Sequence, residues 1–132
     1  MKKFNQLLII PFVIACGASQ HTSSKPPKIV GNWQWMETSG GFAGITKTPE
    51  STNTIKHLQI TTDSIFYYEN GELTNSQPYH LQLAKSMLSN KEEWQLNETI
   101  SKVFINRKDS TLVLWEDCYD CFTHKYLKMN RK

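Results

Sequence analysis

Two cysteines and a histidine near the end of the chain are the residues whose types and spacing could do chemistry. They lie in Cys118-Tyr119-Asp120-Cys121-Phe122-Thr123-His124, a segment between two expected strands. Three interpretations are open. The cysteines can form a short disulfide that holds a hairpin connection, given an oxidising compartment. With His124 they can bind a soft metal such as Cu(I) or Zn, although a structural zinc site prefers four ligands. They can also stay free or exchange electrons, but a redox-active Cys-x-x-Cys normally opens a helix, which this segment does not predict.

The other polar residues form no recognised catalytic motif. The sequence has no Gly-x-Ser-x-Gly, no phosphate-binding loop and no His-Glu-x-x-His. The acidic pairs Glu92-Glu93 and Glu116-Asp117 are adjacent in sequence, so in a strand their side chains would point to opposite faces. They would not converge as the two carboxylates of a glycosidase do. We therefore expect that the protein is not an enzyme and needs no cofactor. The alternative is that it binds copper or zinc.

The first residues have the composition of a targeting segment. Met1-Lys2-Lys3 is a short positive start, and Leu7–Ala15 is an apolar run interrupted by Pro11. A transmembrane helix needs about 20 residues, so this run is too short to span a bilayer. A positive start followed by a short apolar core predicts a secretory signal peptide.

The end of that apolar run, Val13-Ile14-Ala15-Cys16, resembles the lipobox of bacterial lipoproteins. The resemblance implies that residues 1–15 are removed as a lipoprotein signal peptide. It also implies that Cys16 becomes the acylated N-terminus, carrying diacylglycerol and palmitate-type chains. Each buried CH₂ contributes about 0.8 kcal/mol, so two or three chains anchor a protein firmly. Residues 16–28 are then a flexible tether, stiffened at Pro26-Pro27.

Location and partners follow from this anchor and from the charge. No acidic cluster follows Cys16, which favours the periplasmic side of the outer membrane in a bacterial cell envelope. The chain has 15 Lys+Arg and 12 Asp+Glu, and removal of Lys2 and Lys3 leaves an almost neutral protein. There is no basic stripe with interleaved aromatic residues, so nucleic acid is not expected as a partner. We expect a monomer attached to the membrane through its N-terminal lipid.

The remaining residues, 29–132, have the alternation and turn signals of a single all-β domain. The expected strands are Ile29–Glu37, Thr54–Thr61, Ser64–Glu69, Glu72–Asn75, Pro78–Lys85, Glu93–Leu96, Thr99–Asn106, Thr111–Glu116 and Thr123–Met129. A short helix within Leu83–Leu96 is an alternative. About eight strands in roughly 100 residues indicate a barrel or a sandwich. Several strands carry apolar residues on both faces, which favours a single small antiparallel eight-stranded up-and-down barrel over an open two-sided sheet.

A Gly-x-Trp on the first strand, Gly31-Asn32-Trp33, followed by a long loop, resembles the lipocalins. With the lipobox, the chain is similar to small bacterial lipocalin-like lipoproteins of uncharacterised function. The resemblance implies a structural plug in which Gly31 and Trp33 close one end of the barrel and Lys128 or Arg131 packs a cation over the indole. It also implies that Thr38–Asn53 is a lid at the open end.

The functional expectation is a binder. An eight-stranded barrel is wide enough for side chains or one small ligand. The residues expected to contact a small apolar ligand are Phe42, Phe66, Tyr68 and Phe104. We expect a lipid-anchored, non-catalytic envelope protein that binds such a ligand or a partner protein of the envelope. The alternative is a metal- or redox-sensing lipoprotein that uses Cys118, Cys121 and His124.

Overall fold

Antiparallel strands make up most of the protein in the computed structural model, which describes residues 25–96, 101–106 (main chain only) and 110–130. The strands are β1 Gly31–Gly40, β2 Ile45–Lys47, β3 Lys56–Ile60, β4 Ser64–Glu69, β5 Glu72–Pro78, β6 Leu81–Lys85, β7 Glu92–Leu96, β8 Ser101–Asn106, β9 Thr111–Glu116 and β10 Phe122–Lys128. One helical turn, α1, spans Pro49–Thr52. The expectation of an all-β domain is confirmed. The signal peptide, Cys16 and the tether up to residue 24 lie outside the described residues.

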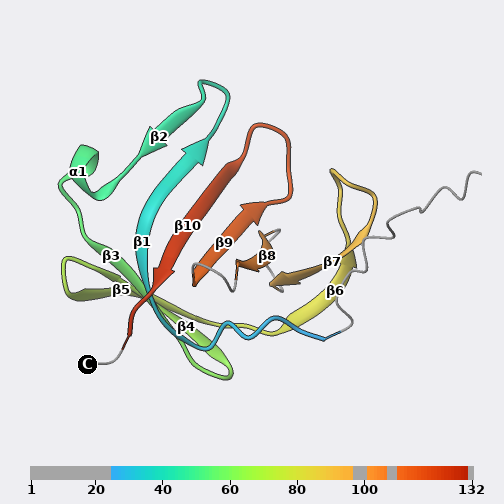
Figure 1. Ribbon diagram of the computed structural model, residues 1–132, viewed down its shortest axis with the longest axis horizontal. Coiled ribbons are helices and arrows are strands. Elements are labelled where there is room, and N and C mark those ends of the chain that lie inside the picture. Colours follow the sequence, from blue (N-terminus) through green and yellow to red (C-terminus); the bar gives the residue numbers. More distant parts are fainter. Residues whose placement is uncertain (1–24, 97–100, 107–109, 131–132) are drawn as a thin grey trace, which may run out of the picture.

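The strands form one curved sheet in the order β5-β4-β3-β1-β10-β9-β8-β7-β6, and β2 pairs with the far end of β1 (Figure 1). The first long strand and the last are therefore neighbours in its middle, as Trp33 opposite Lys128 illustrates. β5 and β6 are consecutive in sequence and stand at the two ends of the order. Among the described residues no ladder joins them, so the closed eight-stranded barrel stays a prediction.

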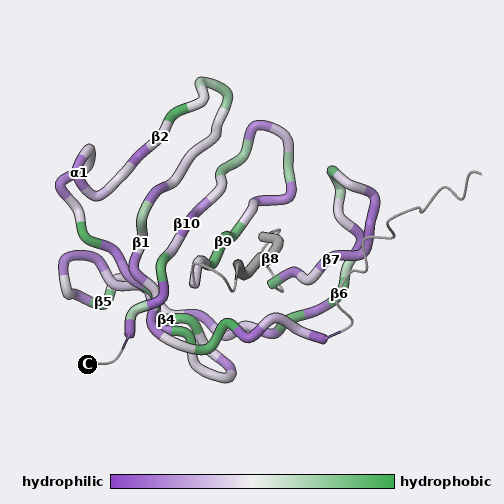
Figure 2. The backbone as a smooth tube through the Cα atoms, viewed as in Figure 1, coloured by the Kyte–Doolittle hydropathy of each residue, from purple (hydrophilic) through white to green (hydrophobic). Residues whose placement is uncertain are grey.

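The core lies on the concave face of this sheet. Inward-facing residues recur at every second position along a strand, and along β1 and β10 the chain changes repeatedly between hydrophilic and hydrophobic positions (Figure 2). The buried cluster comprises Ile29, Trp33, Trp35, Leu58, Ile60, Ile65, Leu96, Leu112, Leu114 and Tyr126. It draws on six strands, from β3 and β4 on one side of β1 to β7 and β9 on the other.

Trp33 sits at the end of the sheet where β1 begins, and we call this end the floor. Its indole Nε1 donates to the carbonyl oxygen of Ile29 at 2.7 Å, so the segment before β1 packs under the ring. The Lys128 ammonium lies 5.4 Å from the centroid of the indole. Gly31 has a φ of +146°, and a β-carbon there would touch the Lys128 side chain. Arg131, the other candidate cation, lies outside the described residues.

The structure excludes the alternative of a helix in one segment and corrects the expected irregular lid in another. Leu83–Leu96 contains no helix, because β6 and β7 pair across it from Leu81 opposite Leu96 to Lys85 opposite Glu92. The expected lid, Thr38–Asn53, is mostly regular structure. β1 continues to Gly40, turns back as β2, and then enters α1, where Thr48 and Ser51 form a reciprocal capping box. Among the described residues, no helix has the length and apolarity that crossing a membrane requires.

Candidate functional site

The Cys118-to-Cys121 segment connects β9 to β10 at the end of the sheet opposite the floor, and we call this end the rim. The two cysteines form a disulfide with their Cα atoms 5.5 Å apart. The turn is further held by the Cys118 amide, which donates to the Glu116 carbonyl at 2.9 Å. The disulfide loop also contacts the β1–β2 hairpin, because the Gly41 amide donates to the Cys121 carbonyl at 3.2 Å. The connection is thus fixed both covalently and by its neighbour.

A continuous chain of hydrogen bonds runs beside the disulfide, and we call it the rim network. The Trp35 indole donates to the Thr38 hydroxyl oxygen at 2.9 Å. The same oxygen lies 2.9 Å from Nδ1 of His124, whose Nε2 lies 3.2 Å from Oε1 of Glu116. The other Glu116 oxygen accepts from the Phe122 amide at 3.0 Å. With the ring proton on Nε2, every donor in this chain has an acceptor.

Strand register explains why these residues meet. Thr38 stands directly opposite His124, and His124 stands opposite Leu114 on β9. A β-bulge between Trp35 and Glu37 shifts the alternation of β1, so that Trp35 and Thr38 both face inward although they are three residues apart. Glu116 follows Leu114 by two positions and therefore faces the same side.

The rim network has the order hydroxyl, imidazole, carboxylate, which is the order of a nucleophile, its base and the group that orients the base. Here the Thr38 oxygen already accepts from a buried indole, and the carboxylate also holds the main chain at Phe122. Each member thereby joins two strands or a strand and a turn. The arrangement accounts for a fixed rim without requiring a reaction.

Possible metal ligands at the rim differ from the expected set. The ligand atoms of Glu116, Cys118 and Cys121 all lie within 4.8 Å of one another. His124 does not belong to that group, but it contacts Glu116 directly. Glu116 was not expected among these ligands, because in the sequence Glu116-Asp117 is only an adjacent acidic pair. Its parity with Leu112 and Leu114 on one strand could have placed it on the inner face.

Asp117, the next residue, ties the rim to the β6–β7 connection. Its carboxylate accepts from the Ser86 hydroxyl at 2.9 Å and from the Met87 amide at 2.7 Å. The Leu88 amide approaches it at 3.4 Å. Asp117 and Ser86 are both buried. A buried carboxylate that receives several hydrogen bonds organises the loop that supplies them.

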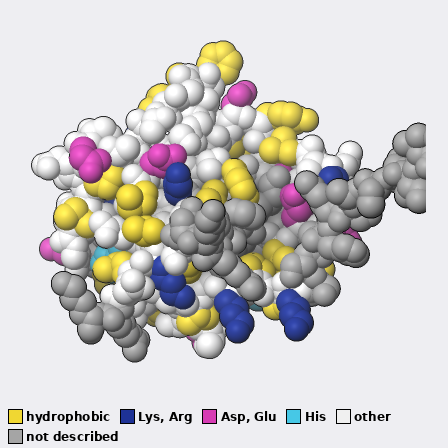
Figure 3. Space-filling view, in the orientation of Figure 1, with side chains coloured by type: hydrophobic (Ala, Val, Ile, Leu, Met, Phe, Trp, Pro, Cys, Tyr) yellow, Lys and Arg dark blue, Asp and Glu magenta, His cyan; other side chains and the backbone are white. Residues whose placement is uncertain are grey.

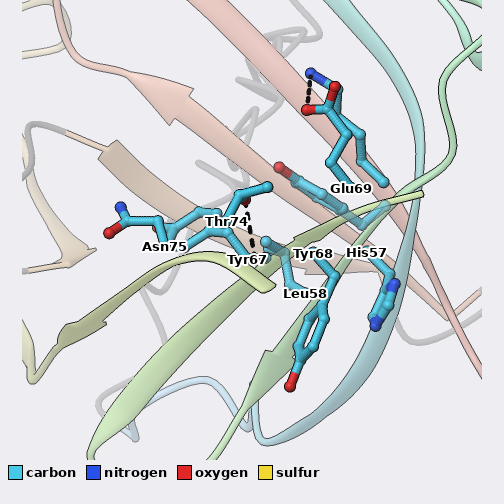
Figure 4. A pocket seen from close by; sticks show the side chains of 9 residues that line it. His57, Leu58, Tyr67, Tyr68, Glu69, Thr74 and Asn75 are labelled. Atoms are coloured by element: carbon cyan, nitrogen blue, oxygen red, sulfur yellow. Dashed lines mark hydrogen bonds and ion pairs between the residues drawn. The ribbon is translucent and has the colours of Figure 1, made fainter. Parts of the chain in front are cut away.

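A hollow of about 250 Å³ lies beside β3, β4 and β5 (Figure 4). Its lining is Lys56, His57, Leu58, Tyr67, Tyr68, Glu69, Thr74, Asn75 and Tyr126. Leu58 and the tyrosine rings give it apolar surface. Lys56 adds charge, because its ammonium lies 3.4 Å from a Glu69 oxygen and 5.5 Å from the centroid of the Trp35 ring.

Two tyrosines of this hollow have perturbed hydroxyl groups. Burial raises the pKa of Tyr67, and a hydrogen bond from the Gln77 amide at 2.8 Å partly opposes that rise. Burial also raises the pKa of Tyr126 well above its usual range, and the nearby Tyr67 adds to the effect. Both hydroxyls are neutral at physiological pH, as an ordinary tyrosine is, and burial keeps them neutral to a higher pH.

The four residues expected to contact a ligand are not gathered around one cavity. Phe42 is at the tip of the β1–β2 turn and is almost fully exposed. Phe66 stands opposite Gln59, on the side of the sheet away from the buried Ile60–Ile65 pair. Tyr68 stacks on His57 with ring centroids 4.4 Å apart and does line the hollow. Phe104 stands opposite Val113 in the β8–β9 ladder, and its side chain lies outside the described residues.

Besides Tyr68, the hollow is lined by Leu58, Tyr67 and Tyr126, which were not expected to contact a ligand. The alternation in Ser64–Glu69 could have indicated Tyr67, because Ile65 and Tyr67 share one face and Phe66 and Tyr68 share the other.

Comparison with known proteins identifies no relative: no family model, no curated protein and no solved structure matches this chain.

Proposed function

We propose that this protein is a lipid-anchored protein of the bacterial envelope whose β domain binds a small apolar ligand, without catalysing a reaction. The lipobox-like segment Val13–Cys16 supports the lipid anchor. In this proposal the acyl chains on Cys16 attach the protein to the periplasmic face of the outer membrane. The proposed architecture is a lipocalin-like up-and-down barrel with eight wall strands, in which β5 and β6, separated only by Tyr79 and His80, form one bent strand. The protein acts as a monomer.

The hollow beside β3 and β4 is the observation that carries this proposal. Its volume of about 250 Å³ is slightly below the range of about 300–1,000 Å³ typical of pockets for drug-sized ligands. Its walls combine apolar side chains with the neutral hydroxyls of Tyr67 and Tyr126. We therefore expect a compact apolar molecule with one hydrogen-bonding group. If the partner is instead a protein of the envelope, we expect it to insert one side chain into the hollow.

Filling the hollow from its exposed side tests the proposal. Thr74 and Asn75 line it and are exposed, so Thr74→Trp and Asn75→Trp would occupy the space with little disturbance of the core. We expect the protein to bind an environment-sensitive naphthalene dye and each variant to weaken that binding at least about tenfold, as loss of a buried apolar contact predicts. Thr62→Trp, at an exposed turn, is the matched control. Equal affinity in all four proteins counts against the hollow as the binding site.

A second candidate function is metal or redox sensing at the rim. The observation that favours it is the approach of Glu116, Cys118 and Cys121 within 4.8 Å. A dithiol reductant would convert the disulfide to two thiols with transfer of two electrons and two protons. Zn²⁺ or Cu(I) would then displace the thiol protons and bind two thiolates and the carboxylate. Thiolates suit both metals, and His124 stands beside Glu116.

Titration with Zn²⁺ before and after reduction separates this candidate from the first. We expect binding only after reduction and loss of that binding in Cys118→Ser. Glu116→Gln should weaken it, and Glu72→Gln, an exposed carboxylate on β5, should not. Reduced protein that takes up neither zinc nor copper rules the candidate out and leaves the dye experiment unaffected.

A further inference from the structure

Three chain connections meet at the rim, and each exposes an apolar side chain at its tip. They are residues 41–44 between β1 and β2, 86–91 between β6 and β7, and 117–121 between β9 and β10 (Figure 1). Phe42 is 95% exposed, Tyr119 is 77% exposed and Met87 is 62% exposed, and Leu88 beside it is exposed as well. In the space-filling view, a hydrophobic side chain projects at the end that holds the β1–β2 turn (Figure 3).

The three connections hold one another in place. The central one, 117–121, binds the β1–β2 hairpin through Gly41 and Cys121, and it binds the β6–β7 connection through Asp117. The disulfide stiffens it further. Because these contacts fix the main chain, the apolar tips stay exposed and do not fold back onto the sheet. A surface that is ordered before binding loses little conformational entropy when it binds.

Charge at the tips is low and balanced. Within the three connections the exposed charged residues are Lys91 and Asp120, one of each sign. The whole segment from Thr38 to Thr46, which forms the end of the β1–β2 hairpin, carries no charged side chain. Attraction to an anionic or cationic partner is therefore not the basis of recognition here. Recognition would depend on burial of the Phe, Tyr, Met and Leu side chains.

We propose that the rim docks on an electrically neutral lipid surface, with the three tips inserted into the interfacial layer of a bilayer. Separate projecting tips suit a fluid surface, whereas a stable protein partner needs about 800 Å² of contiguous contact on each side. Apolar side chains of peripheral proteins enter the headgroup boundary by about 5–10 Å, and tyrosine favours that layer. This docking is separate from the ligand in the hollow, because Phe42, Met87, Leu88 and Tyr119 do not line it.

Vesicle binding without the lipid anchor tests this docking surface. The protein is the chain from residue 16 with Cys16→Ser, which contains every described residue and has no acyl chain. With phosphatidylcholine vesicles we expect co-sedimentation that Phe42→Ser and Tyr119→Ser each weaken about tenfold, as removal of one buried aromatic predicts. The double variant Met87→Gln/Leu88→Gln should act similarly. Raising the salt concentration should change nothing, because neutral docking is not screened.

The matched control is Leu73→Ser on β5, which removes a side chain that is 55% exposed away from the rim. It should bind as the parent protein does. Circular dichroism checks that each variant is folded, which is expected because all the altered side chains are exposed. Absence of vesicle binding, or equal weakening by Leu73→Ser, overturns the proposal. If light scattering shows a dimer that Phe42→Ser dissociates, and no vesicle binding occurs, the rim is instead the contact with a second copy of the chain.

Discussion

The Thr38 hydroxyl and Nδ1 of His124 lie 2.9 Å apart although 86 residues separate them in the sequence. This contact joins the first long strand of the sheet to the last at the rim, as the contact of Trp33 with Lys128 joins them at the floor. The ladder between β1 and β10 is therefore held at both ends by side chains that face inward. Because this ladder lies in the middle of the sheet, a rigid β1–β10 pair determines how the strands on its two sides are placed.

Thr38→Val should destabilise the protein by about 1–3 kcal/mol, the usual effect of leaving a buried donor without an acceptor. The donor is the Trp35 indole, and valine keeps the shape of threonine but cannot accept its hydrogen bond. The measurement is the free energy of unfolding in urea. Thr46→Val, at an exposed position on β2, is the control and should change it by less than about 0.5 kcal/mol. Equal effects of the two substitutions would mean that the rim network adds nothing to stability.

Asp117→Ala should release the β6–β7 connection. The substitution leaves the Ser86 hydroxyl and the Met87 amide without their shared acceptor, at about 1–3 kcal/mol for each buried donor. Hydrogen exchange of the Met87 amide should accelerate strongly, while amides of β3 change little. Asp120→Asn, in the same turn but exposed, is the control. Unchanged exchange at Met87 in Asp117→Ala would contradict the proposed role of the carboxylate.

Gly40→Ala should weaken the contact between the β1–β2 hairpin and the disulfide loop. A β-carbon at Gly40 would overlap the Cys121 carbonyl oxygen, and the φ of +129° disfavours any other residue. Gly44→Ala is a matched control, because Gly44 also has a positive φ, +61°, but has open space around it. Backbone strain of this kind costs about 1–3 kcal/mol, so both variants lose stability. The additional loss in Gly40→Ala, measured by thermal unfolding, reports the steric clash, and identical losses would argue against it.

Local sequence signals identified several strands well. Ser64–Glu69 and Thr111–Glu116 were predicted with the bounds that the structure gives. The Asn70-Gly71 turn between β4 and β5 has φ values of 52° and 87°, the positive values for which Asn and Gly are favoured. These features depend only on neighbouring residues, which is why alternation and turn chemistry suffice to find them.

The candidate sites depended on information that local patterns do not contain. The bulge between Trp35 and Glu37 brings Thr38 to the inner face, and no local signal marked it. Glu116 meets His124 only because β9 pairs with β10 in one particular register. The hollow was missed for a different reason. Size alone singles out Phe66 in the sequence, whereas shared parity with the buried Ile65 places Tyr67 on the core side of β4.

Alkaline pH should destabilise the protein through Tyr67 and Tyr126. Burial raises the pKa of both hydroxyls in the folded state, whereas an unfolded tyrosine titrates near 10. Below about pH 10 both states hold the protons, so these tyrosines add no pH dependence. Above it the unfolded state loses protons that the folded state keeps. The free energy of unfolding then falls with pH, by up to about 1.4 kcal/mol per unit for each tyrosine.

Tyr126→Phe should therefore reduce the slope of stability against pH between about pH 10 and 12, and Tyr67→Phe should reduce it less because the Gln77 hydrogen bond opposes the shift. Urea unfolding at a series of pH values measures that slope. Tyr119→Phe alters an exposed tyrosine and should leave it unchanged. If Tyr126→Phe and Tyr119→Phe have the same alkaline slope, the Tyr126 hydroxyl is accessible to water in the folded protein, and the wall of the hollow is more open than its burial indicates.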